Sequence, residues 1–246
     1  MSSRPPVPKS SPPPPRHRPP LAAGVVQSLT TAIVTEEYPS GTALPPTGML
    51  CEMYQVSRTV VREAITALAE KGLVTARQGW GTIVLEQNHW SLLDPQILDA
   101  LFQRADRLRY LDNLIQIRIT LECPMTAEAA RRVTKEEAAQ LSAHLRTLAG
   151  LLDDAGAYAS ADIAFHDHIH RVSGDTFGRA IVSSLQGRAL HTSQYSGNPT
   201  RAELELTHLA HTRVHDRILA GDADGAAQAM REHITNSWAR RRPQEP

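Results

Sequence analysis

The chain is poor in aromatic side chains, in cysteine and in long apolar runs. Aromatic residues make up 4% of its 246 residues, and the only cysteines are Cys51 and Cys123. Two cysteines exclude a disulfide-rich scaffold and a cysteine-based zinc motif, and they fit a reducing cytoplasm. No apolar run approaches the roughly 18 residues that span a bilayer, and the N-terminus lacks the apolar core of a signal peptide. We therefore expect a cytoplasmic protein with no membrane partner.

The chain also lacks a net charge, because 26 basic residues balance 26 acidic ones. Global charge therefore neither supports nor excludes a nucleic-acid partner, but the local distribution is uneven. Residues 1–20 are rich in proline, contain basic residues and contain no acidic residue. Such a segment cannot bury enough apolar surface to fold, so we expect a disordered or polyproline arm.

The spacing of apolar residues after this arm predicts three helices followed by a hairpin. The expected helices are about 21–37, 47–54 and 57–71, with Ser57 as N-cap of the third and Gly72 at its end. Two short strands, about 74–78 and 82–85, flank a Gly-Trp-Gly turn. This order is that of a winged helix-turn-helix, whose third helix enters a major groove of DNA while the hairpin touches the adjacent backbone.

The third predicted helix places polar side chains where DNA contacts are expected. Arg58, Thr59 and Arg62 lie in its first turns. Its buried stripe is expected to consist of Val60, Ala64, Ile65 and Leu68. An arginine at this end can bind guanine in a bidentate manner, which contributes roughly 1–3 kcal/mol of discrimination. Two arginines alone are more often a solvated helix face, but the hairpin that follows favours DNA binding.

The segment VSRTVVREAITALAEKGLV, followed by RQGWGTIV, resembles the N-terminal domain of GntR-type bacterial repressors. The resemblance covers roughly residues 21–87 and implies double-stranded DNA as partner and a nucleoid-associated location. It implies the DNA-contacting residues Ser57, Arg58, Thr59, Arg62, Gly79, Trp80 and Gly81. Three positions depart from the family pattern. Thr47 and Gly48 stand where an acidic residue and an arginine are common, so one contact is missing or the operator differs. Gln55 replaces a turn glycine and must tolerate a strained turn.

The second half of the chain is predicted to be entirely helical. Residues 88–94 form a linker, and Asp94 and Pro95 begin a helix as cap and first-turn residue. From residue 95 to 242 we expect six or seven helices, including segments at about 134–154, 157–172, 177–195, 203–220 and 222–241. Without a competing strand pattern, this favours an antiparallel helical bundle. The expected fold is mainly α, with a winged helix-turn-helix ahead of the bundle.

Histidines are concentrated in this bundle. Asp162 and His166 are four residues apart and project from one helical face, His208, His211 and His215 share a face of a later helix, and His233 lies on the last helix. A carboxylate and imidazoles from three helices suit Zn²⁺, Ni²⁺ or Mn²⁺. A single helical histidine is more often a surface or hydrogen-bonded core residue, so the metal interpretation depends on partners from other helices.

The segments DIAFHDHI, AHTRVHDRILAGD and AAQAMREH resemble the FCD ligand-binding domain of the FadR branch of GntR regulators, over roughly residues 95–236. The resemblance implies the metal ligands Asp162, His166, His211 and His233, with zinc as the first choice of metal. His208 and His215 do not match the pattern and are expected to face solvent or a neighbouring helix.

The same resemblance implies a small carboxylate effector that completes the metal coordination. Arg118 is the expected partner of its carboxylate, although a helix-stabilising pair with Glu122, worth a few tenths of a kcal/mol, is an equally good interpretation. His191 is expected to support a ligand or to line the effector pocket. The segment WSLLDPQIL is similar to regulators of sugar-acid catabolism of the galactonate type, which favours an aldonate or related hydroxy acid.

These patterns predict a transcriptional regulator and not an enzyme. We expect a homodimeric repressor that binds a palindromic operator, with two recognition helices one DNA turn apart. A metal-dependent hydrolase with a DNA-docking domain is the first alternative, but no general base is indicated by spacing. A regulator that binds an apolar acyl ligand without metal is the second, and the four candidate ligands argue against it.

Overall fold

The computed structural model describes residues 21–189 and 199–242. The predicted N-terminal arm at 1–20 and His191 lie outside the described residues. No described helix is long and apolar enough to cross a membrane.

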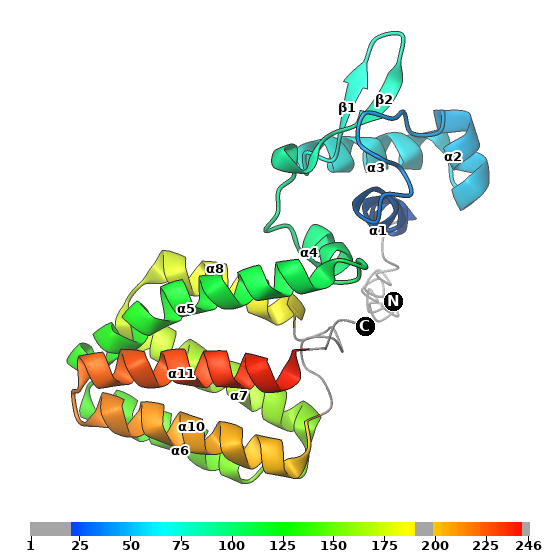
Figure 1. The fold of residues 1–246 in the computed structure, drawn as a ribbon. Coiled ribbons are helices and arrows are strands. Elements are labelled where there is room, and N and C mark those ends of the chain that lie inside the picture. Colours follow the sequence, from blue (N-terminus) through cyan, green and yellow to red (C-terminus); the bar gives the residue numbers. More distant parts are fainter. Residues whose placement is uncertain (1–20, 190–198, 243–246) are drawn as a thin grey trace, which may run out of the picture.

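The N-terminal part is a winged helix-turn-helix, as predicted (Figure 1). Its elements are α1 (Leu21–Val34), α2 (Thr47–Tyr54), α3 (Arg58–Glu70), β1 (Val74–Arg77) and β2 (Gly81–Val84). The strands are antiparallel, with Val74 opposite Val84 and Arg77 opposite Gly81. Helix α1 ends at Val34, about one turn earlier than expected, because Glu36 leaves the helix in a left-handed conformation with φ 66°.

Helix α3 begins and ends at the predicted residues. The Ser57 hydroxyl accepts a hydrogen bond from the Val60 amide at 3.4 Å. Gly72 follows the C-cap with φ 74°, and a Cβ at this position would lie 2.0 Å from the His89 carbonyl oxygen. The expected buried stripe was partly wrong. Val61 is fully buried and Val60 only partly so, because steps of three and four place Val61, Ala64 and Leu68 on the inner face.

The turn before α3 contains the strain that the sequence predicted. Gln55 adopts φ 52° and ψ 44° as the left-handed C-cap of α2. For a residue with a Cβ this conformation costs roughly 1–2 kcal/mol. The Gln55 side chain donates a hydrogen bond of 2.7 Å to the Glu52 carbonyl, which offsets part of that cost.

The C-terminal part is an all-α bundle, which confirms the predicted fold class. The described elements after the wing are η1 (Gln87–His89), α4 (Pro95–Leu101), α5 (Arg107–Arg132), α6 (Lys135–Ala149), α7 (Ala155–Ser173), α8 (Thr176–Ala189), α10 (Arg201–Leu219) and α11 (Ala223–Arg241). Helix α5 packs along α11 and against α7, and α10 packs against α11 and α6. This arrangement surrounds a core of fully buried side chains such as Leu111, Phe165 and Val214.

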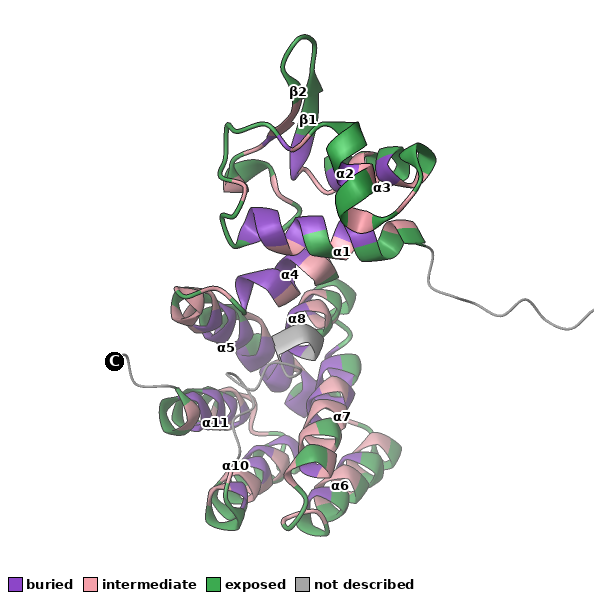
Figure 2. Ribbon diagram, turned by 90° about the vertical axis from the view of Figure 1, so that its right-hand side faces the viewer, coloured by how far each residue is buried: buried purple, intermediate pink, exposed green. Residues whose placement is uncertain are grey.

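Helix α4 joins the two parts because it contributes to both cores. Its residues Ile97, Ala100 and Leu101 are buried with the N-terminal core, whereas Leu98 is buried with the bundle core. Figure 2 shows α4 as a largely buried helix between α1 and the bundle, where it packs against α8. The expected boundary at residues 94 and 95 assigns α4 to the bundle alone, but its side chains are divided between both parts.

Polar contacts hold α4 against the helices of the N-terminal part. One oxygen of Asp94 caps α4 through the Gln96 amide at 2.9 Å, and the other forms an ion pair with Lys71 at the end of α3. Beyond α4, the largely buried Arg104 donates a hydrogen bond to the Val34 carbonyl at the end of α1. It also pairs with Glu36 at 2.8 Å and with Asp106 at 2.7 Å.

We predict that Arg104→Met destabilises the protein. The change removes the donor to the buried Val34 carbonyl and should lower the free energy of unfolding by about 1–3 kcal/mol. Urea unfolding followed by circular dichroism measures the effect. Arg131→Met is the control, because Arg131 is half-exposed and forms only a surface pair with Glu128, so its removal should change stability by less than about 0.5 kcal/mol. Equal effects of the two substitutions would contradict the assignment.

Candidate metal centre and DNA-binding surface

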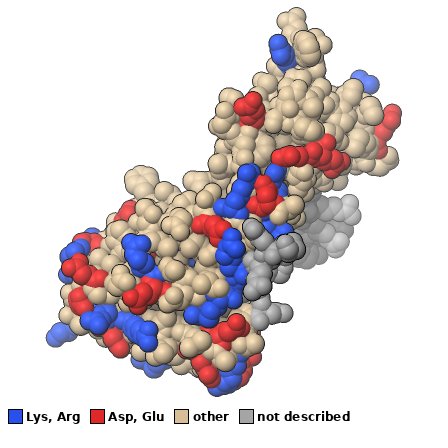
Figure 3. All heavy atoms as spheres, in the orientation of Figure 1, with Lys and Arg blue, Asp and Glu red and all other residues tan. Residues whose placement is uncertain are grey.

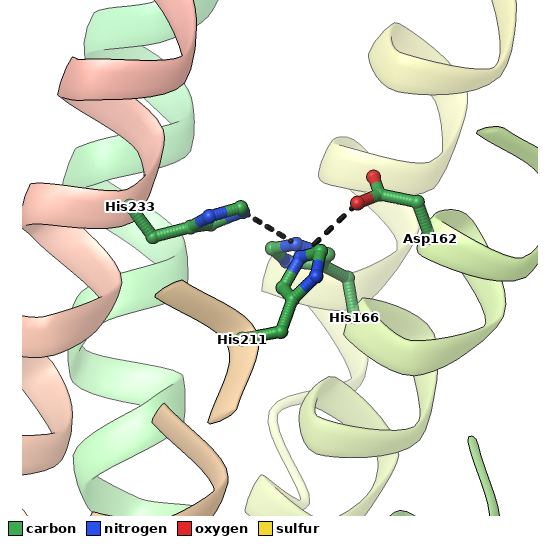
Figure 4. Close-up of side chains that lie close together, drawn as sticks. All are labelled: Asp162, His166, His211 and His233. Atoms are coloured by element: carbon green, nitrogen blue, oxygen red, sulfur yellow. Dashed lines mark hydrogen bonds and ion pairs between the residues drawn. The ribbon is translucent and has the colours of Figure 1, made fainter. Parts of the chain in front are cut away.

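The structure brings together the four side chains that the sequence predicted as metal ligands. Helix α7 contributes Asp162 and His166, α10 contributes His211, and α11 contributes His233 (Figure 4). One nitrogen or oxygen atom of each lies within 4.8 Å of those of the others. The Nε2 atoms of His166 and His233 are 3.1 Å apart, and His211 Nε2 is 3.1 Å from Asp162 Oδ1.

Apolar packing around the group fixes the helices that supply it. Phe165 precedes His166 and is fully buried, with its ring centroid 4.8 Å from that of His211. Val214 lies three residues after His211, and Met230 lies three residues before His233; both are fully buried. Asp162, His211 and His233 are therefore each about one helical turn from a core side chain that anchors the backbone, and His166 is adjacent to one.

The candidate ligands are buried, and two of their nitrogen atoms lack hydrogen bonds. His166, His211 and His233 are each less than 5% exposed, whereas the Asp162 side chain is 19% exposed. His211 Nε2 and His233 Nδ1 have no hydrogen-bond partner among the described residues, although His211 Nε2 lies close to Asp162. A buried polar atom without a partner costs about 1–3 kcal/mol. A divalent cation among these atoms would supply a partner to the His211 nitrogen, so the donor set fits a metal ion.

The protonation states also favour a cation. Burial lowers the pKa of His211, although Asp162 opposes this effect, and burial lowers the pKa of His233 well below its ordinary value. Both imidazoles are therefore neutral near pH 7 and offer lone pairs. Burial would raise the pKa of Asp162, but the contact with His211 outweighs this effect and lowers it well below its usual range. Asp162 is thus a carboxylate.

A second cluster of polar side chains lies on the Nδ1 side of His166. Glu122 on α5 is fully buried and accepts from Arg118 Nε at 2.5 Å and from His166 Nδ1 at 2.7 Å. His170 Nε2 lies 3.1 Å from the same Glu122 oxygen as His166. Burial would raise the pKa of Glu122, but the Arg118 guanidinium and His166 outweigh this effect and lower it well below its ordinary value.

This cluster shows what sequence reasoning missed. Arg118 was expected to bind an effector or to pair with Glu122, and the structure shows the pair with Glu122. The part played by His170 was not predicted. His166 and His170 are four residues apart and share a helical face, so their spacing could have indicated a common partner.

The remaining histidines of α10 lie outside the four-residue group, as expected. His215 Nε2 is 2.8 Å from the Ser142 hydroxyl on α6, and His215 Nδ1 is 2.9 Å from Asp216. His208 is half-buried and makes no hydrogen bond through Nδ1 to the described residues. His211 instead has the Tyr158 hydroxyl 3.3 Å from its Nδ1 atom.

The residues predicted to contact DNA form an exposed surface at the opposite end of the molecule from the bundle. All of them are exposed. They are the N-cap residue Ser57, then Arg58, Thr59 and Arg62 of α3, and Gly79, Trp80 and Gly81 of the wing. Trp80 at the wing tip is 67% exposed, and the Arg77 guanidinium lies 5.0 Å from its ring centroid. On the face shown in Figure 3, most charged side chains gather over the bundle and its junction with the N-terminal part. The surface predicted to contact DNA therefore contains few charged side chains, with Arg58 and Arg62 as its basic residues on α3.

Comparison with known proteins matches both parts of the chain. Residues 21–84 match the model of the bacterial regulatory proteins of the gntR family, and residues 113–236 match the FCD domain model. An uncharacterised HTH-type transcriptional regulator of Escherichia coli, YieP, is 32% identical over 83% of this chain and 88% of its own. The galactonate operon transcriptional repressor of Escherichia coli is 29% identical over 88% of this chain and 94% of its own. The putative L-lactate dehydrogenase operon regulatory protein of Escherichia coli is 29% identical over 87% of this chain and 84% of its own.

A solved structure has the same fold. The Listeria monocytogenes protein Lar, described as controlling expression of the agr system, is 16% identical, covers 88% of this chain and 94% of its own, and superimposes with a TM-score of 0.59. At this identity the likeness shows the fold alone. The two family matches, the relative at 32% identity and the fold together show that the chain is a DNA-binding transcriptional regulator of the GntR family with an FCD domain.

Proposed function

We propose that this regulator is a repressor that binds its operator through α3 and the wing and responds to a small carboxylate bound at a divalent metal in the bundle. The buried convergence of Asp162, His166, His211 and His233 is the observation on which the proposal depends. An apolar ligand pocket would not require four ionisable groups from three helices, and burying such groups without a partner is costly.

The donor set indicates the chemistry of the ion. Three imidazoles and one carboxylate suit Zn²⁺ first, and Ni²⁺ or Mn²⁺ next. When bound, the ion would attract an anionic effector oxygen to any coordination position that the protein leaves open. The partly exposed Asp162 lies on the side of the group where solvent reaches it, whereas the histidines are enclosed.

The relatives support a hydroxy acid as effector. Two of them are named for the galactonate and L-lactate dehydrogenase operons, whose named compounds are both hydroxycarboxylates. Arg118 remains the proposed partner of the effector carboxylate, but its Nε atom is already held by Glu122 at 2.5 Å. The effector carboxylate must therefore share Arg118 with Glu122. His191 is retained as a proposed effector-binding residue.

Control of DNA binding would act on the geometry of a homodimer. Two recognition helices must be about one DNA turn apart to occupy a palindromic operator. An effector that favours another spacing by roughly 1–3 kcal/mol is enough to reduce operator occupancy. Helix α4 supports such coupling, because its buried side chains contact both the bundle and the DNA-binding part.

We predict that Arg62→Ala sharply weakens operator binding. Loss of one phosphate contact should also reduce the slope of log affinity against log salt concentration by about 0.9. Fluorescence anisotropy with a duplex selected from a random library measures both effects across a salt series. Arg131→Ala is the control, since this exposed arginine lies on α5 and pairs with Glu128. Unchanged affinity in Arg62→Ala would remove Arg62 from the DNA-binding surface.

We predict that the purified chain contains about one equivalent of divalent metal and that His211→Ala loses it. His211 has its Nε2 atom inside the four-residue group, so its removal leaves three candidate ligands. Elemental analysis of protein prepared without added metal or chelator gives the content per chain. His215→Ala is the matched control, one turn further along α10 with Ser142 as partner, and it should retain the metal. Equal metal content in the two variants would exclude His211 as a ligand.

The metal-bound chain should respond to hydroxy acids. We expect galactonate or L-lactate to lower operator affinity about 5- to 150-fold, the range typical of coupled sites. The His211→Ala variant should bind the operator but show no such response. A response that persists in His211→Ala, or a chain that takes up no Zn²⁺, Ni²⁺ or Mn²⁺ on reconstitution, would contradict the metal-dependent proposal.

A further inference from the structure

Glu122 is a buried carboxylate that three donor side chains surround. It lies on α5, next to the Nδ1 side of the candidate metal ligand His166, and its side chain has no exposed surface. Its Oε1 atom accepts from Arg118 at 2.5 Å, and its Oε2 atom faces His166 at 2.7 Å and His170 at 3.1 Å. A carboxylate with this many partners is unlike an ordinary helix-surface glutamate.

Arg118 and the two histidines contact different oxygens of the Glu122 carboxylate. The Arg118 ion pair neutralises the buried carboxylate and leaves its second oxygen directed towards α7. That oxygen meets both His166 and His170, which share one face of α7. Because a carboxylate oxygen only accepts, each imidazole nitrogen that faces it must donate its N–H. The arrangement therefore determines which nitrogen of each ring holds hydrogen.

For His166 this constraint has a direct effect on the candidate metal centre. With Nδ1–H directed at Glu122, Nε2 is the ring nitrogen that can offer a lone pair. The Nε2 atom is the one that belongs to the four-residue group, 3.1 Å from His233 Nε2 (Figure 4). A carboxylate that holds the far nitrogen of a metal-binding imidazole fixes the orientation of its ring and makes it a better ligand.

We propose that Glu122 is a positioning residue that orients His166 for metal binding, with His170 and Arg118 holding Glu122 in place. The inference rests on the proposed metal-dependent function and adds to it a residue from a fourth helix, α5. It also makes α5 a direct structural support of the metal centre. Among the four candidate metal ligands, His166 is the one for which a hydrogen bond with the Glu122 carboxylate is observed in the described residues.

The first test measures metal affinity of Glu122→Gln. This substitution keeps the size of the side chain but removes the charge and one of its acceptor oxygens. Competition with a chromophoric chelator for Zn²⁺ should show an affinity about 10- to 100-fold weaker than that of the unsubstituted chain. The matched control is Glu128→Gln, on the same helix but with a side chain 43% exposed, and its affinity should not change. Equal Zn²⁺ affinities for Glu122→Gln and the unsubstituted chain would overturn the proposal.

Glu122→Gln removes the carboxylate that pairs with Arg118, so a loss of metal affinity must be distinguished from a loss of folding. A double variant makes this distinction. Arg118→Met combined with Glu122→Gln removes both members of the buried ion pair, which is often tolerated better than removal of one. Its Zn²⁺ affinity should fall as in the single variant, while its circular dichroism spectrum remains that of the unsubstituted chain. A folded double variant with full affinity would overturn the role of Glu122.

A second measurement separates this inference from the proposed function. Nitrogen-15 NMR of the metal-free, unsubstituted chain reports which ring nitrogen of His166 holds hydrogen. We expect Nδ1–H with a free Nε2 atom, and the opposite tautomer would overturn the inference. If the chain then fails to take up Zn²⁺ despite the expected tautomer, the metal-dependent function fails while the contact between Glu122 and His166 stands.

Discussion

The structure depends above all on the burial of α4 in two cores at once. Ile97 and Leu101 complete the packing under α1, and Leu98 packs into the bundle. Because burial of such side chains stabilises by roughly 1.5–3 kcal/mol each, neither part can move away from α4 without exposing apolar surface. Asp94 and Arg104 add polar contacts to the ends of α3 and α1, so the recognition helix is held by the same short helix that meets the bundle.

The bundle combines this apolar packing with a polar interior that packing alone does not explain. The fully buried Glu122, the partly exposed Asp162 and several buried histidines lie between α5, α7, α10 and α11. Such groups are destabilising unless each has a partner. Glu122 has three partners within the chain, whereas His211 and His233 retain nitrogen atoms without hydrogen bonds. Both oxygens of Glu122 thus have partners within the chain, whereas the group of Asp162, His166, His211 and His233 is suited to receive an ion.

The sequence predicted the parts of the molecule that follow from local rules. The spacing of apolar residues and the capping residues predicted the helices, and the Gly-Trp-Gly turn predicted the wing. These features depend on neighbours along the chain. Val61 was missed because a shift of one residue on a short helix changes which side chain is buried. The ligand group was predicted from family resemblance, whereas the contacts of Glu122 with His166 and His170 were not, since they join α5 to α7 across 44 and 48 residues.

Helix α5 connects the proposed ligand site to the junction with the DNA-binding part. Glu122 is on α5, and α5 begins immediately after the loop in which Arg104 contacts the end of α1. A ligand that changes the balance of Arg118 between Glu122 and an effector carboxylate would therefore act on a helix that begins at this junction. Only 1–3 kcal/mol of bias is needed for regulation, which is comparable to one buried hydrogen bond to a charged group. Close packing at α4, which contacts α8 in the bundle and α1 in the N-terminal part, favours transmission of a small shift from the bundle, because a well-packed core has little free volume to absorb it.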